Sequence, residues 1–163
     1  MELIGRINRK KIYYIQVRNN PNWESNLPKN DWIAFTVANK EDEELIPSVV
    51  KICIDKNVAY TSSTGEAAHH TEDYFDEEIA WNMVDYELKT KKEFDSENLT
   101  PTISDENFED SFWFTYTSIY DDNFLIDKIV CIDFTTQKIK NQLIELIEKV
   151  NNGFILNNKP NES

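Results

Sequence analysis

Runs of β-branched and aromatic residues recur along the chain, most of them bounded by Asn, Asp, Pro or Gly. Such side chains pack well on a pleated sheet, so each run is typical of a strand. The pattern predicts strands at 11–17, 32–38, 58–63 and 128–134. A further run at 99–104 contains Pro101, which has no backbone N–H to donate to a neighbouring strand. We therefore expect this run at the edge of the sheet.

Apolar residues at helical spacing separate most of these strands. Leu45, Val49, Ile52 and Cys53 stand at i, i+4, i+7 and i+8, which places them on one side of a helix. The same spacing predicts three further helices, through Phe75, Ile79, Met83 and Tyr86, through Phe108, Phe112, Tyr116, Ile119 and Tyr120, and through Ile139, Leu143, Leu146, Ile147 and Val150.

Polar and glycine residues mark the ends of these helices. Thr71 is a candidate N-cap for the helix that carries Phe75, and the polar residues 88–98 after it lack periodicity, which predicts a loop. Gly153 stands just past the last apolar residue of the final helix, where glycine closes many helices.

In chain order the predicted elements run β, β, α, β, α, β, α, β, α. This alternation predicts an α/β fold with a mostly parallel sheet of about five strands and helices on both faces, arranged as in Rossmann-like or flavodoxin-like proteins. A chain of 163 residues with 40% hydrophobic residues can bury one sizeable core. We expect a single domain over residues 1–156 and a frayed tail over 157–163.

The formal net charge of −13 is concentrated in the middle of the chain. Residues 1–40 carry seven basic and three acidic side chains (+4), residues 41–127 carry five and twenty-three (−18), and residues 128–163 carry five and four (+1). Such a field repels phosphate backbones and anionic membranes, so direct binding to nucleic acid or membrane is not expected. A basic protein partner would be attracted to it.

The hydropathy pattern and the cysteines predict a cytoplasmic protein. No apolar run approaches the roughly 18 residues that span a bilayer, and residues 1–17 alternate charged with apolar residues instead of forming a signal peptide. Cys53 and Cys131 each lie among aliphatic residues, where a free thiol behaves as a small buried hydrophobe.

The stretch from 61 to 78 contains both histidines of the chain. On a helix, His69 or His70 could converge with Asp73 on a divalent metal, the only cofactor that the residues suggest, with Glu72 or Glu77 alongside. The competing explanation is that acidic residues gather in the first turn of a helix because its N-terminus is partly positive, and that both histidines face solvent. Adjacent histidines also point in different directions, which disfavours a shared metal.

A second candidate site is a surface for a basic protein partner. The acidic segments of the middle region would supply its carboxylates, and an aromatic side chain in the polar loop NNPNWESN would anchor the contact. The predicted residues are Trp23, Asp73, Asp76, Glu77, Asp105, Glu106, Asp110, Asp121 and Asp122. The alternative is an ordinary solvated acidic face.

The acidic segments EDEE (41–44), TEDYFDEE (71–78) and DENFED (105–110), together with small size and abundant Asn, Ile and Lys, resemble those of small acidic bacterial immunity and inhibitor proteins. The resemblance is one of overall character and transfers no functional residue. It implies a non-catalytic protein that docks on a basic partner. Two alternatives stay open: a small metal-dependent enzyme or sensor that uses His69, His70 and Asp73, and a regulatory α/β domain without pocket chemistry.

Overall fold

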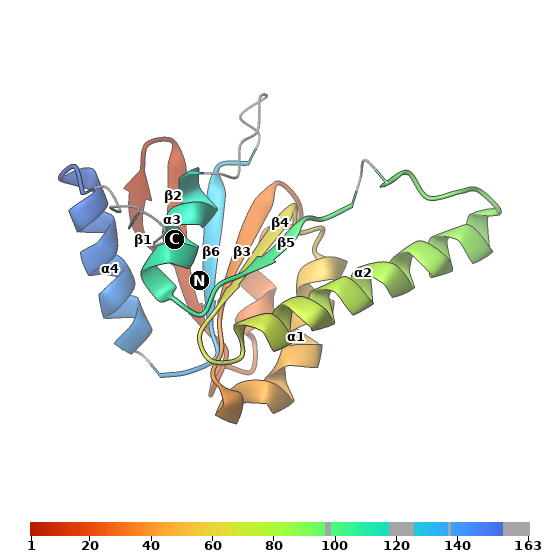
Figure 1. Ribbon diagram of the computed structural model, residues 1–163, viewed down its shortest axis with the longest axis horizontal. Coiled ribbons are helices and arrows are strands. Elements are labelled where there is room, and N and C mark those ends of the chain that lie inside the picture. Colours follow the sequence, from red (N-terminus) through yellow and green to blue (C-terminus); the bar gives the residue numbers. More distant parts are fainter. Residues whose placement is uncertain (97–98, 118–125, 137, 155–163) are drawn as a thin grey trace, which may run out of the picture.

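The computed structural model describes residues 1–96, 99–117, 126–136 and 138–154. They form a six-stranded sheet in the order β1-β2-β6-β3-β4-β5, with α-helices on its two faces (Figure 1). The strands are β1 (Glu2–Ile7), β2 (Lys10–Gln16), β3 (Trp32–Val37), β4 (Tyr60–Thr64), β5 (Thr102–Ser104) and β6 (Lys128–Asp133). The helices are α1 (Ile46–Asp55), α2 (Ala68–Thr90), α3 (Phe108–Thr117) and α4 (Lys138–Asn151), with short 3-10 helices η1 (Trp23–Asn26) and η2 (Lys40–Leu45).

Two hydrophobic clusters lie on opposite faces of the sheet, because successive side chains of a strand point to opposite faces. Trp32 and Ala34 of β3 belong to the cluster with α1, the start of α2 and η1. Ile33 and Phe35 belong to the cluster with α3 and α4. The central strands are buried on both faces, which explains their continuous apolar runs. The predicted α/β fold with helices on both faces is confirmed.

The strand order differs from the Rossmann-like and flavodoxin-like arrangements. The chain moves across the sheet in one direction from β2 through β3 and β4 to β5, and then returns so that β6 lies between β2 and β3. Parallel crossovers have one hand, so the returning connection must cover the other face, and α3 does. If the five parallel strands are numbered 1 to 5 by their order in the chain, they lie across the sheet in the order 1-5-2-3-4. The two expected folds have the orders 3-2-1-4-5-6 and 2-1-3-4-5.

The sheet has six strands because the N-terminal residues form β1, which pairs antiparallel with β2. This strand was not predicted, because ELIGRI contains two charged residues and a glycine, and only Ile7 of the six is buried. Gly5 lets β1 approach α4: a Cβ atom there would lie 2.9 Å from Ile147 Cγ2.

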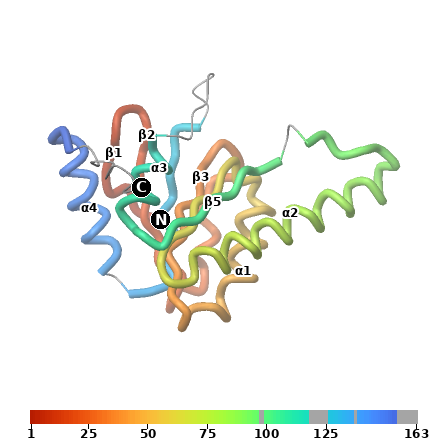
Figure 2. Tube along the Cα trace, in the orientation of Figure 1, coloured from red at the N-terminus to blue at the C-terminus, as the bar shows by residue number. Residues whose placement is uncertain are grey.

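Helix α2 is longer than predicted at both ends. It begins at Ala68, so Thr71 lies inside the helix and donates its Oγ1 hydroxyl to the Ala67 carbonyl (2.8 Å) instead of acting as the N-cap. It continues to Thr90, into the predicted loop, and its second half projects well beyond the sheet (Figure 2). The turn before it requires Gly65, which has φ +95° and would place a Cβ atom 2.4 Å from the Ala38 carbonyl oxygen.

Of the remaining predictions, some are confirmed by the structure, and others concern residues that the structure does not describe. The helix predicted over 108–120 is present as α3, and Ile119 and Tyr120 lie outside the described residues, as does the tail 157–163. Gly153 follows α4 with φ +90°, as expected for a glycine that closes a helix. No helix in the described ranges is both long enough and apolar enough to span a bilayer.

Candidate functional site

The first half of α2 lies along the edge strand β5, and side-chain hydrogen bonds join them. His69 Nδ1 lies 2.7 Å from Ser104 Oγ, and Ser104 also donates to the Glu72 carboxylate. One turn further along α2, Thr102 Oγ1 donates to Asp76 Oδ1 (2.5 Å). These bonds hold the carboxylates of α2 beside the turn that leads from β5 into α3.

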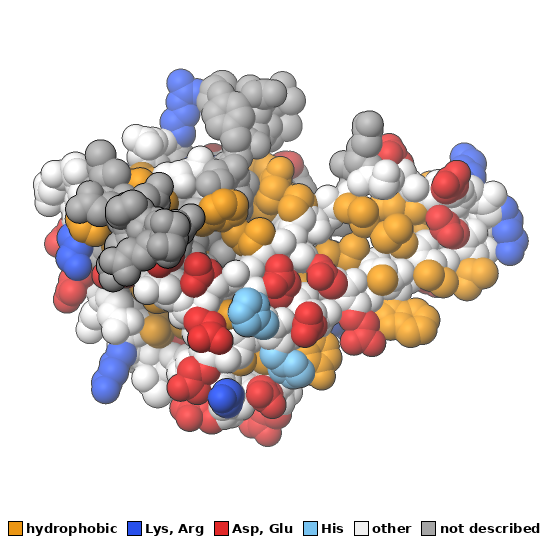
Figure 3. Space-filling model, in the orientation of Figure 1, with side chains coloured by type: hydrophobic (Ala, Val, Ile, Leu, Met, Phe, Trp, Pro, Cys, Tyr) orange, Lys and Arg blue, Asp and Glu red, His pale blue; other side chains and the backbone are white. Residues whose placement is uncertain are grey.

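We call the resulting surface the acidic face. It consists of Glu72, Asp73, Asp76, Asp105, Glu106 and Asp110, of which only Glu72 is partly buried. Figure 3 shows Asp and Glu side chains gathered around the two histidines on this side of the molecule, where Lys and Arg are sparse. The hydrogen bonds between α2 and β5 thus bring together the two distant segments, 72–76 and 105–110, that carry five of the predicted partner-binding residues.

The carboxylates of the acidic face have no Lys or Arg partner among the described residues. Within the described part of the chain, no Lys or Arg forms an ion pair with any of its six carboxylates. The one cationic contact would come from His69, whose Nδ1 is 4.0 Å from Glu72 Oε2, and only if the ring is protonated. Like charges held together without counter-charges create a local negative potential that extends into solvent.

Helix-end electrostatics account for only part of this surface. Asp110 lies in the first turn of α3, and its N–H donates to the Asn107 side chain (3.0 Å), so it complements a helix N-terminus. Asp73 and Asp76 lie beyond the first turn of α2, which contains no acidic residue. Because the dipole effect falls off within one turn, it does not explain these two carboxylates.

The histidines do not converge with Asp73 on a common point. The His69 ring contacts Ser104, whereas the His70 ring packs edge-on against Tyr74, with ring centroids 4.9 Å apart. Among the residues described, no group of three His, Cys, Asp or Glu side chains is placed to hold a metal ion. The contacts of His69 and His70 therefore do not support the predicted metal arrangement.

The contacts of His69, Ser104 and Glu72 also differ from those of a catalytic triad. In a triad the carboxylate orients the histidine, which in turn activates the hydroxyl. Here Glu72 accepts a hydrogen bond directly from Ser104, and His69 bonds to the same hydroxyl while its side chain is 70% exposed. These bonds fix α2 against β5. They do not give Ser104 a histidine base that a carboxylate holds in position.

Trp23 is not the exposed anchor that its polar loop predicted. Its side chain is 7% exposed and packs with Leu27 in the core cluster under η1. The loop is polar in composition, but η1 folds back over the sheet and inserts these two apolar side chains. Asp121 and Asp122 lie outside the described residues, and Glu77 is exposed on α2.

A different group of ionisable residues occupies the carboxyl end of β6, the region where open α/β sheets usually bind ligands. Asp133 is completely buried and accepts three hydrogen bonds, from the Tyr14 hydroxyl (2.6 Å), the Thr135 N–H (2.8 Å) and Thr135 Oγ1 (2.7 Å). Burial raises the pKa of Asp133, while these hydrogen bonds act in the opposite direction. Burial and the bond to Asp133 also raise the pKa of Tyr14.

Asp42 lies near this group and is equally well satisfied. Its side chain is 1% exposed and forms an ion pair with Arg18 (2.6 Å), which raises the pKa of Arg18. Arg18 Nε also donates to the Phe134 carbonyl (3.4 Å), so the pair ties η2 to β6. Asp133 stands out in the sequence as a charged residue inside an apolar run, but nothing local links Arg18 to Asp42.

The comparisons with known proteins identify a family without assigning a function. Residues 12–150 match the model of a domain of unknown function, DUF7684, and the chain belongs to this family. The match extends from β2 to α4 and leaves out β1. Comparison with curated proteins gives no match, and comparison with solved structures gives none.

Proposed function

We propose that this protein is a non-catalytic binding protein whose acidic face docks on a basic surface of a protein partner. One observation carries the proposal: carboxylates from α2 and from the β5–α3 turn are held side by side, exposed, and without a Lys or Arg partner in the described chain. Holding like charges together costs free energy in the isolated protein, and a cationic partner would recover it.

The acidic face would act first on the rate of encounter. Complementary potentials attract a partner over several ångströms and can raise association rates by orders of magnitude at low salt. Exposed charge pairs contribute little to the final affinity, since water and ions compete for them. The proposal therefore predicts fast association that slows steeply as ionic strength rises.

The specific form that we propose is an immunity or inhibitor type of protein, acting in the cytoplasm on a basic protein. Support comes from the small size, the net charge of −13 and the fixed acidic face, which together suit a protein that covers a cationic surface. A regulatory α/β domain without such a partner would not require its carboxylates to be grouped.

A charge-matched comparison in lysate of the native host tests the proposal. The acidic-face variant carries Asp73→Asn, Glu106→Gln and Asp110→Asn, and the control carries Glu24→Gln, Glu145→Gln and Glu148→Gln, which remove the same charge elsewhere. After cross-linking at low salt, we expect wild type and control to retain the same basic protein and the acidic-face variant to lose it. Equal retention by both variants would contradict the proposal.

A further inference from the structure

The projecting half of α2 carries apolar side chains on two opposite sides. On one side, Ile79, Met83 and Tyr86 lie beside Phe94 and Leu99 of the segment that follows the helix, and the Tyr86 and Phe94 rings are 5.5 Å apart. On the other side, Trp81, Val84 and Leu88 are 62%, 46% and 63% exposed. We call these three residues the outer stripe.

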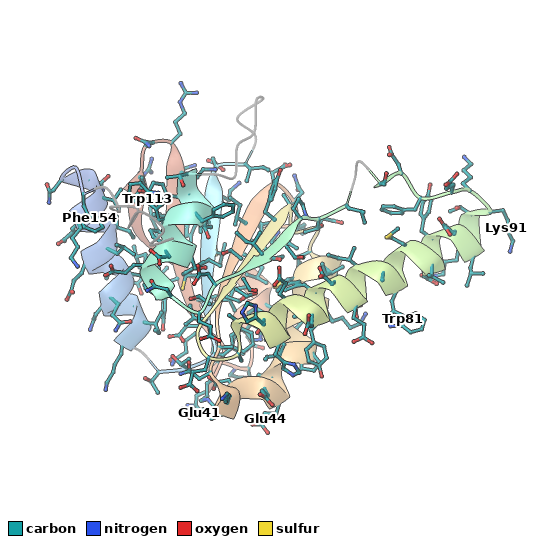
Figure 4. The ribbon with its side chains drawn as sticks, viewed as in Figure 1. Glu41, Glu44, Trp81, Lys91, Trp113 and Phe154 are labelled. Carbon is teal, nitrogen blue, oxygen red and sulfur yellow. The ribbon has the colours of Figure 1, made fainter. Side chains whose placement is uncertain are left out.

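The outer stripe is a continuous surface. At 100° per residue its three side chains fall within about 60° of one another, and Trp81 points away from the sheet (Figure 4). A solvated helix normally presents polar residues on the side opposite its packed face, so an uncovered row of Trp, Val and Leu indicates a surface that another helix can cover.

Charges at the two ends of the outer stripe are opposite in sign. Glu77 lies seven residues before Val84 and on the same side of the helix, and Lys91 lies seven residues after Val84, at the far tip of α2 (Figure 4). Neither residue forms an ion pair within the described chain. The surface is therefore acidic toward the body, apolar in the middle and basic at the tip.

We infer that the outer stripe binds the outer stripe of a second copy of this chain, with the two α2 helices antiparallel about Val84. Residues equally far from Val84 then meet across the two-fold axis. Glu77 lies opposite the partner's Lys91, and Trp81 lies between the partner's Val84 and Leu88. The same patch serves on both subunits, as a two-fold interface requires.

The charge order is what selects a second copy over another partner. A purely basic partner would repel Lys91, and a purely acidic one would repel Glu77, whereas an antiparallel copy satisfies both. The second half of α2 projects beyond the sheet (Figure 2), so the sheet does not lie between the outer stripe and a second copy. A single helix pair lies at the low end of specific interfaces, below about 1,200 Å² in total, so we expect a dimer that dissociates on dilution.

Variants that reverse the charge of Glu77 or Lys91 test the register of this dimer. The dimer dissociation constant is measured by sedimentation equilibrium over a concentration series. In a dimer of Glu77→Lys, two lysines face each other in each pair, and in a dimer of Lys91→Glu, two glutamates do. We expect each variant to weaken dimerisation by about tenfold or more. An equimolar mixture of the two variants restores both attractive pairs and should dimerise like wild type.

Control variants separate this interface from general charge effects. Glu145→Lys on α4 and Lys29→Glu in the η1 loop make the same charge changes elsewhere and should leave dimerisation unchanged, as should the acidic-face variant. Trp81→Ser combined with Leu88→Ser should abolish the dimer while the circular dichroism spectrum stays native. A wild-type chain that remains monomeric across the series, or a mixture that fails to restore dimerisation, would overturn the inference.

Discussion

Two sets of carboxylates lie toward the same end of the sheet and have opposite surroundings. Asp42 and Asp133 are 1% and 0% exposed, and each is bound by donors of the protein itself. Asp73 and Glu106 are exposed and pair with no cation of the described chain. All four side chains are carboxylates, so the difference shows that partners within the fold decide whether a carboxylate stabilises the protein or remains available to a ligand.

The largest effect should come from removing a buried carboxylate. Asp133→Ala leaves the Tyr14 hydroxyl and the Thr135 N–H without their acceptor inside the core. Buried donors that lose an acceptor keep their desolvation cost, so we expect the free energy of unfolding to fall by about 3 kcal/mol. Urea denaturation measures it. A loss of unfolding free energy as small as that expected for an exposed aspartate would show that Asp133 does not belong with the buried, stabilising carboxylates.

A somewhat smaller effect should follow from Arg18→Ala, which leaves Asp42 buried without its cation. Arg18 is itself partly exposed, and water can replace some of its contact, so we expect a loss of about 2 kcal/mol. The double variant Arg18→Ala with Asp42→Ala should lose less than the sum of the two single variants, because no charge is then left unpaired. Additive losses would show that the two side chains act independently.

The pH dependence of stability distinguishes burial of Asp133 from its hydrogen bonding. Burial raises the pKa of Asp133 in the folded state. The folded protein then holds this proton more tightly than the unfolded chain, so the contribution of Asp133 to stability decreases as pH rises from about 4 through the raised pKa. Relative to wild type, Asp133→Asn should therefore become more favourable over that interval. A difference that is constant with pH, or that changes in the opposite direction, would contradict this assignment.

The smallest effect on stability should come from the acidic face. Asp73→Asn, Glu106→Gln and Asp110→Asn together remove charges that have no cationic partner in the described chain, so we expect the free energy of unfolding to change by no more than about 0.5 kcal/mol. Urea denaturation beside the control Glu24→Gln, Glu145→Gln and Glu148→Gln measures it. A large loss would mean that these carboxylates stabilise the fold.

The parts of the fold that the sequence predicted are those with a local signal. Strands β3 and β6 are buried on both faces and read as continuous apolar runs, and α4 has a regular apolar stripe. Strand β1 was not predicted because ELIGRI includes Glu2, Gly5 and Arg6 and buries only Ile7, so it has no β-branched or aromatic run. The burial of Trp23 escaped prediction because it depends on how a long loop folds over the sheet, which no local pattern records.

The candidate site divides in the same way. Charge counting singled out Asp73, Asp76, Asp105, Glu106 and Asp110, and the hydrogen bonds between α2 and β5 bring their segments together. The outer stripe was not predicted, because the helical pattern through Ile79 and Met83 describes only one apolar side of α2. Trp81, Val84 and Leu88 form a second apolar side. The full length of α2 was not predicted either, since Lys89 and Thr90 are polar but continue the helix.

The most direct test of the central claim maps where a simple cation binds. An octalysine peptide is titrated into the ¹⁵N-labelled protein, and amide shifts are followed at low and high salt for wild type, the acidic-face variant and its charge-matched control. The account predicts shifts confined to residues around Asp73 and Glu106, abolished by salt and by the acidic-face variant, and kept in the control. Shifts spread evenly over exposed carboxylates, including Glu145 and Glu148, or equal shifts in both variants would contradict it.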